Sequence, residues 1–114
     1  TMRIDVKKSV EQFEIGEKTY QLDVSDDLLF QYEEKFGEMQ RKSGEEITFE
    51  EQTELVKEML NFMFKSETAG EEIYQECGKS TFHLISVVEQ ILEHLAVVLT
   101  EKKNTKLKKY LNKK

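Results

Sequence analysis

The sequence predicts one α+β domain that is mostly α: an N-terminal β-hairpin followed by three to four helices, the C-terminal one being the longest. Apolar and polar residues alternate in the first quarter of the chain, and apolar residues recur at helical spacing through the rest. The 114 residues include no proline. Because proline marks loops, edge strands and linkers, its absence favours helices joined by tight turns.

Two predicted strands flank Gly16, a residue that readily adopts the positive φ of a hairpin turn. Ile4 and Val6 also alternate with polar residues and predict an additional strand before the hairpin. The apolar members of the two hairpin strands are Phe13 and Ile15, then Tyr20, Leu22 and Val24.

The hairpin loop has an even length in the absence of a bulge, because residues opposite each other share a face of the sheet. A two-residue loop, Gly16-Glu17, pairs Phe13 with Tyr20. A four-residue loop through Thr19 pairs Phe13 with Leu22 instead. Both registers put the apolar side chains of the two strands on one face, and a three-residue loop needs a bulge.

Capping signals delimit the first two predicted helices. Ser25 precedes two aspartates and supplies a capping oxygen, and the pair Ser43-Gly44 ends this helix. Thr48 and Glu51 form a capping box for the next helix, which we expect to run to about Lys65.

Two further helices complete the predicted fold. A short one covers residues 70–77 and ends at Gly78, at the position just past a helix that glycine favours. Ser80 then caps the longest helix, which starts at Thr81 and extends at least to Lys102. No repeat or linker composition appears, so we expect residues 1–101 to form a single domain.

The charge is unevenly distributed along the chain. Residues 1–101 carry 10 basic and 23 acidic residues, a net charge of −13, whereas the overall value is −6. We therefore predict a basic C-terminal tail over residues 102–114, either an extension of the last helix or disordered. Lysines suit the negative end of a helix dipole, and the acidic body disfavours a nucleic-acid partner. The tail lysines are Lys102, Lys103, Lys106, Lys108, Lys109, Lys113 and Lys114.

Cys77 is the only cysteine, so neither an internal disulfide nor a zinc site built on cysteine pairs is expected. No stretch of about 18 apolar residues suggests a membrane span or a membrane partner. Together these features predict a protein of the reducing cytoplasm. We expect Cys77 to be a small buried core residue rather than a nucleophile.

The sequence predicts no enzyme, cofactor or metal site. His83 and His94 lie on one flank of the last helix, but a separation of ~16 Å along the helix axis is too great for a shared metal ion. We expect both to be partly exposed surface residues. Adjacent glutamates diverge on a helix, and no phosphate-binding loop, calcium loop or nucleophile elbow is present.

The helix over residues 49–64 carries more apolar surface than one packed side requires, roughly 200° of its circumference. Either two neighbours in the same domain enclose this helix, or part of the arc is a docking surface for another protein or a second copy. Phe30 lies opposite the apolar stripe of the first helix, where the hairpin or a partner would have to cover it. The predicted partner-binding residues are Phe30, Met59, Phe62, Met63 and Phe64.

The order of motifs resembles that of the tail assembly chaperones of long-tailed phages and prophages of Gram-positive bacteria. The similarity starts with Phe13-Glu14-Ile15-Gly16-Glu17-Lys18-Thr19-Tyr20-Gln21-Leu22-Asp23, followed by Ser25-Asp26 and Tyr32-Glu33. It continues with Gly70-Glu71-Glu72-Ile73-Tyr74, Gly78-Lys79-Ser80-Thr81 and a long Val/Leu/Glu helix. The resemblance spans nearly the whole chain, although each of its motifs is short.

The resemblance implies a cytoplasmic assembly factor of the bacterial host cell that is absent from the mature virion. Such chaperones coat the aggregation-prone tape-measure protein and help recruit tail-tube subunits, so these two proteins are the expected partners, with a homo-oligomer as a further association. The family supplies no catalytic residues. The alternatives are a head–tail or tail component retained in the virion, and an acidic decoy that mimics DNA.

Overall fold

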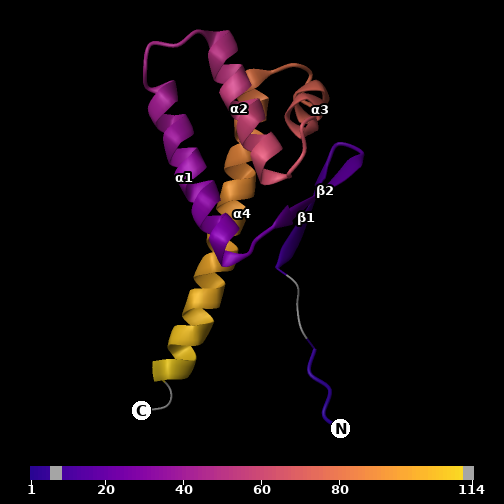
Figure 1. Cartoon of the computed structure of the whole chain (residues 1–114), viewed down its shortest axis with the longest axis vertical. Helices are drawn as coiled ribbons and strands as arrows, with labels where there is room; N and C mark the ends of the chain where they lie inside the picture. Colours follow the sequence, from indigo (N-terminus) through magenta and orange to yellow (C-terminus); the bar gives the residue numbers. More distant parts are fainter. Residues whose placement is uncertain (6–8, 112–114) are drawn as a thin grey trace.

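The computed structural model describes the backbone of residues 1–5 and 9–111, and the side chains of residues 1–5 and 9–97. It confirms a mostly helical α+β fold in which a hairpin precedes the helices and the last helix is the longest (Figure 1). The elements are β1 (Val10–Ile15), β2 (Lys18–Asp23), α1 (Asp26–Ser43), α2 (Phe49–Met63), α3 (Ala69–Glu76) and α4 (Thr81–Leu111).

The hairpin has the shorter of the two predicted loops. β1 and β2 are antiparallel, Phe13 pairs with Tyr20, and Gly16 has a φ of 66°. Because the pairing places the apolar residues on one face, Tyr20 and Leu22 are buried. The additional strand predicted around Ile4 is absent from the described residues 1–5, where Ile4 is exposed and belongs to no strand; Val6 lies outside the described residues.

Helix α1 starts after Ser25, as predicted, but by a different capping interaction. The Ser25 hydroxyl makes no capping hydrogen bond; instead, the Ser25 backbone N–H donates to Asp23 Oδ1 at 2.9 Å. The helix ends at Ser43, immediately before Gly44, which confirms the predicted end. The carboxylate two residues upstream therefore organises the chain at the start of α1.

The capping signals of the other helices are confirmed. Thr48 Oγ1 accepts a hydrogen bond from the Glu51 backbone N–H at 3.1 Å at the start of α2. Past the end of α3, Gly78 adopts a positive φ of 66°. At the start of α4, Ser80 Oγ accepts from the His83 backbone N–H at 3.3 Å. Local sequence therefore fixes most of the helix boundaries.

Helix α2 occupies the centre of the fold and contacts α1, α3 and α4. Its wide apolar arc is thus covered largely by neighbours in the same chain, the first of the two interpretations that the sequence left open. The core also takes its buried side chains from β2, α1, α3 and α4. The largest fully buried residues are Tyr32, Leu22, Leu60, Met63, Ile73, Leu84, Val56 and Val88.

The protein is elongated, with principal extents of 56 × 31 × 19 Å, and both α4 and the N-terminal residues 1–5 extend well past the other elements (Figure 1). The backbone of the predicted basic tail is helical as far as Leu111, and residues 112–114 lie outside the described residues. Within the described part of the chain, no helix is both long enough and apolar enough to cross a membrane.

Candidate functional site

Three of the predicted partner-binding residues belong to the core. Met59 and Met63 are 3% and 1% exposed. Phe64 is covered by the hairpin, since its ring centroid lies 6.5 Å from that of Phe13 and 5.1 Å from that of Tyr20. These side chains are enclosed by the chain itself, so we place no docking surface on them.

The other two predicted residues keep accessible surface but lie apart from each other. Phe62 is half-buried against the Tyr32 ring, with a centroid distance of 6.0 Å, and Lys35 Nζ lies 5.2 Å from its centroid. Phe30 is 63% exposed on α1. The structure therefore does not unite the five residues into one surface.

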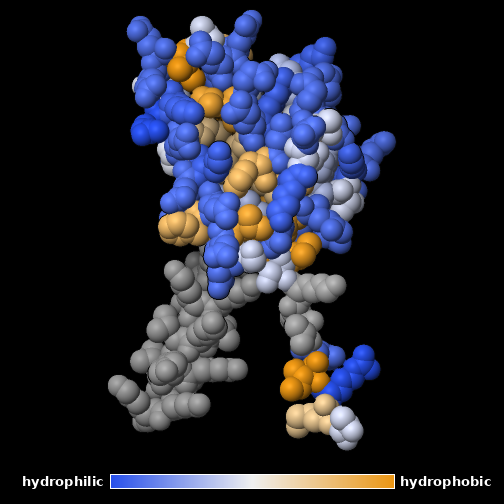
Figure 2. All heavy atoms as spheres, viewed as in Figure 1, coloured by the Kyte–Doolittle hydropathy of each residue, from blue (hydrophilic) through white to orange (hydrophobic). Residues whose placement is uncertain are grey.

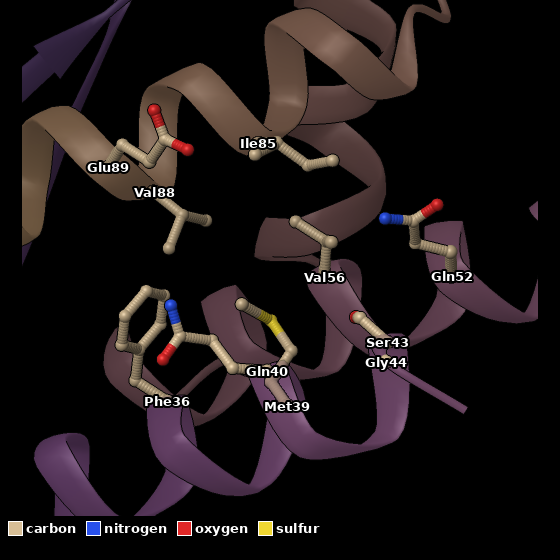
Figure 3. A pocket seen from close by; sticks show the side chains of 10 residues that line it. All are labelled: Phe36, Met39, Gln40, Ser43, Gly44, Gln52, Val56, Ile85, Val88 and Glu89. Carbon is tan, nitrogen blue, oxygen red and sulfur yellow. The ribbon is translucent and has the colours of Figure 1, made fainter.

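A groove of about 340 Å³ lies between α1 and α4, with α2 at its side (Figure 3). We call it the α1–α4 groove. The polar or small residues along it are Gln40, Ser43, Gly44, Gln52 and Glu89. Its apolar lining comes from three helices and consists of Phe36, Met39, Val56, Ile85 and Val88.

The Tyr32 hydroxyl anchors α1 beside the groove. It donates a hydrogen bond to the Asp23 backbone oxygen at 2.6 Å, and the Met63 backbone oxygen lies 3.4 Å away. This side chain is 1% exposed, and its burial raises the pKa of Tyr32 to about 12. A neutral, hydrogen-bonded phenol thus joins α1 to the end of β2 and to the end of α2.

Two exposed phenylalanines extend the apolar surface beyond the groove. Phe49 is 59% exposed and Phe82 is 76% exposed, and their ring centroids lie 6.2 Å apart. Phe82 precedes Ile85 by three residues in α4, and Phe49 precedes Gln52 by three in α2. Residues three apart share a helix face, so the aromatic pair, Phe49 and Phe82, continues the groove at the N-terminal ends of both helices.

Buried hydroxyl groups hold the two helix ends together next to this pair. The Thr53 hydroxyl donates to the Phe49 backbone oxygen at 2.9 Å, and Thr53 Oγ1 lies 2.7 Å from Thr81 Oγ1. Because Thr53 donates its proton to Phe49, Thr81 is the donor in the hydroxyl pair. The aromatic pair is therefore exposed on two helix ends that buried hydrogen bonds of Thr53 and Thr81 hold together.

Only part of this surface was predictable from the amino-acid pattern. Phe82 falls outside the apolar stripe of its helix, which is a signal of exposure. Phe49 lies within the apolar stripe of α2, where periodicity alone predicts burial. Its exposure results from its place at the first residue of α2, beyond the reach of the helices that cover the middle of α2.

Few titratable side chains line the groove. Glu89 is the only charged residue among those that line it. His83 and His94 are exposed, as predicted, and His94 lies near Glu11, with 3.6 Å between Nε2 and Oε2. Cys77 is half-buried rather than fully buried, and its burial raises the pKa of the thiol. Among the described residues, no three His, Cys, Asp or Glu side chains gather closely enough to hold a metal ion.

Most of the face seen in Figure 2 is hydrophilic, and apolar atoms appear on it as small separate patches. The α1–α4 groove has five apolar residues in its lining, and the exposed aromatic pair lies one turn away on α2 and α4; surfaces of this kind suit helix-in-groove recognition. Comparison with protein-family models, curated proteins and solved structures found no match to this chain.

Proposed function

We propose that this protein is a phage tail assembly chaperone that holds an apolar helical segment of the tape-measure protein in the α1–α4 groove. The observation that carries the proposal is the groove together with its exposed aromatic pair. The resemblance of the motif order to tail assembly chaperones, from Phe13 to the long last helix, supports the same function.

The groove suits a partner helix by shape and chemistry. A helix that presents apolar residues at spacings of three and four places them in one stripe, which fits a narrow apolar groove. Met39 is a flexible lining residue that accommodates side chains of different shape. Phe49 and Phe82 supply exposed aromatic surface, the kind of residue that most often anchors a protein interface.

The charge of the body is consistent with a solubilising role. Residues 1–101 carry a net charge of −13, so a complex with an apolar partner keeps a strongly charged exterior. In the proposed function the protein acts in the cytoplasm of the bacterial host, also helps to recruit tail-tube subunits, and is absent from the finished virion.

The test is co-expression with the tape-measure protein encoded in the same genome. We expect the tape-measure protein to remain soluble and to co-purify with this chain in a fixed ratio. A tape-measure protein that stays insoluble, with this chain alone in the supernatant, would overturn the proposal and favour a structural tail component. Mass spectrometry of purified virions separates the two functions further, since a retained component is present in the particle.

Matched substitutions locate the binding surface. Phe49→Ser with Phe82→Ser removes the aromatic pair, and Phe30→Ser removes an equally exposed phenylalanine that does not line the groove. Loss of one aromatic anchor is expected to weaken the complex by about 30-fold, because such anchors contribute about 2 kcal/mol or more each, and loss of both by up to about 800-fold. Equal losses in the double variant and in Phe30→Ser would contradict the groove assignment.

A further inference from the structure

The hairpin has two outer edges, and its register decides which backbone groups face each of them. In an antiparallel pair, alternate residues exchange both of their backbone hydrogen bonds with the partner strand, and the residues between them point these groups outward. The Val24 backbone N–H donates to the Ser9 oxygen at 2.7 Å, and the bonded pairs follow from there at every second residue. The N–H and C=O groups of Val10, Gln12 and Glu14 therefore point away from β2.

The outer edge of β2 is engaged by the body of the protein. Asp23 pairs with Val10, so it also points its carbonyl oxygen outward, and this oxygen accepts a hydrogen bond from the Tyr32 hydroxyl at 2.6 Å. Tyr32 is 1% exposed, so the bond is buried in the core. A strand added on this side would have to compete with a buried hydroxyl for the Asp23 oxygen.

The outer edge of β1 has no such partner. Within the part of the chain that the structure describes, no group bonds to the outward N–H and C=O groups of Val10, Gln12 and Glu14, and residues 1–5 form no strand. All three side chains are exposed. We call these three residues the open edge. Unpaired backbone groups in a row are a template for pairing with another strand.

A cleft lies next to the open edge. The hairpin stands beside α4 (Figure 1), and the space of about 510 Å³ between β1 and α4 has apolar lining from Phe13, Ile15, Val87 and Ile91. His94 also lines the cleft, with its ring perpendicular to that of Phe13 at a centroid distance of 5.4 Å. A strand added to the open edge would place every second side chain on the same face as Phe13 and Ile15, over this lining.

The walls of the cleft are acidic. Residues 9–17 include three glutamates and no basic residue, and residues 81–97 of α4 include two glutamates and no lysine or arginine. Glu14 lines the cleft and is exposed on the outer face of the hairpin. Because opposite charges on neighbouring strands stabilise a sheet, a strand with basic side chains on that face is complementary to β1.

We propose that the open edge of β1 binds an extended segment of another protein in which apolar and basic residues alternate. The segment adds a third strand to the hairpin, and its backbone pairs with the outward groups of Val10, Gln12 and Glu14. Its apolar side chains enter the cleft between β1 and α4, and its basic side chains lie on the face of Glu14.

This site is separate from the α1–α4 groove. The cleft and the groove share no lining residue, although α4 contributes to both. One copy of the protein can therefore hold an extended segment and a helical segment together. The inference does not depend on the proposed function, since it involves other residues and another kind of peptide, and each proposal can fail without the other.

The first test is amide hydrogen exchange, followed by NMR on the full chain with and without a probe peptide. The probe is an acetylated and amidated heptapeptide of alternating lysine and valine. We expect the amide hydrogens of Val10, Gln12 and Glu14 to exchange rapidly in the free chain and to slow by about tenfold or more at saturation, because each gains a hydrogen bond. Protection of these amides in the free chain would show that the chain or a second copy covers the edge, and would overturn the proposal.

Two backbone-methylated forms of the probe separate strand addition from attraction between charges. One form carries N-methyl groups on its lysines and the other on its valines, so the charge of the two is the same. Only one set of N–H groups faces β1 in an added strand. One form should therefore bind at least about tenfold more weakly than the unmodified probe, and the other should bind nearly as well. Equal binding by the two forms, or no binding of the unmodified probe at about 1 mM, would overturn the proposal.

A matched pair of proline substitutions locates the edge. Gln12 and Gln21 are exposed and pair with each other across the hairpin, and their N–H groups point to opposite outer edges. Proline is tolerated where a strand N–H faces outward, so both variants keep the ladder between β1 and β2. Gln12→Pro should weaken probe binding by about tenfold or more, and Gln21→Pro should leave it within about twofold. Equal effects would contradict the assignment to β1, and the methylated probes decide the question on the unchanged chain if either variant unfolds.

Discussion

The substitution Gly70→Ala tests the closest contact between α2 and α3. A Cβ atom at Gly70 would lie 2.7 Å from the Cα and 2.8 Å from the carbonyl carbon of Lys57, where the optimum between nonbonded carbons is about 3.5–4.0 Å. The two helices would have to separate by about 1 Å. This movement would also lengthen the 2.7 Å hydrogen bond from the Gly70 backbone N–H to Asn61 Oδ1.

The sign of the effect follows from two opposing terms. Alanine in place of glycine favours a helix by about 1 kcal/mol. Overpacking costs about 1–3 kcal/mol, and the upper end applies here because the obstacle is backbone rather than a movable side chain. We expect the free energy of unfolding to fall by about 2 kcal/mol, measured by urea denaturation followed by circular dichroism at 222 nm.

Gly37→Ala is the matched control for this substitution. Gly37 lies within α1, and no atom would lie within 4 Å of a Cβ atom there. Only the helix preference remains, so the free energy of unfolding should rise by up to about 1 kcal/mol. Unchanged or increased stability in Gly70→Ala would refute the steric argument, and decreased stability in Gly37→Ala would refute the propensity argument.

Other predictions concern single hydrogen bonds and a pKa. Tyr32→Phe removes the hydroxyl donor to the Asp23 backbone oxygen and should lower the free energy of unfolding by about 1–2 kcal/mol in the same urea assay. The raised pKa of Tyr32, about 12, means that the unfolded state loses this proton first as the pH rises. The Tyr32 contribution to stability should therefore decline above pH about 10, by up to about 1.4 kcal/mol per pH unit, and Tyr32→Phe should lack that share of the decline. Thr48→Ala removes the acceptor of the Glu51 backbone N–H and should cost about 1 kcal/mol, with the midpoint of thermal unfolding as the readout.

Local signals in the sequence account for much of the fold. Alternation around Gly16 and the parity of the loop limited the hairpin to two unbulged registers, of which the structure has the one that pairs Phe13 with Tyr20. Thr48, Ser80 and Gly78 mark helix ends because their interactions lie within a few residues along the chain. The predicted capping by the Ser25 hydroxyl was wrong: this hydroxyl makes no capping hydrogen bond, and the hydrogen bond at the start of α1 instead runs from the Ser25 backbone N–H to the Asp23 carboxylate.

The candidate site was much less accessible to sequence reasoning. Met59 and Met63 belong to an apolar arc that suits a docking surface and a central core helix equally well. Periodicity measures how much of a helix is apolar, but it does not show how many neighbours pack against that helix. The structure shows that the arc belongs to the core, because α1, α3 and α4 all contact α2.

The kinds of element, most of their boundaries and the charge difference between residues 1–101 and the last 13 residues were predictable, since they depend on interactions within a few residues or on composition alone. Which apolar side chains remain accessible depends instead on how the elements pack. Phe64 is buried because the distant hairpin folds over it, and Phe49 and Phe82 are exposed because nothing in the described part of the chain reaches the ends of their helices. Burial depends on contacts between segments far apart in the sequence, and a periodic pattern in one helix carries no information about them.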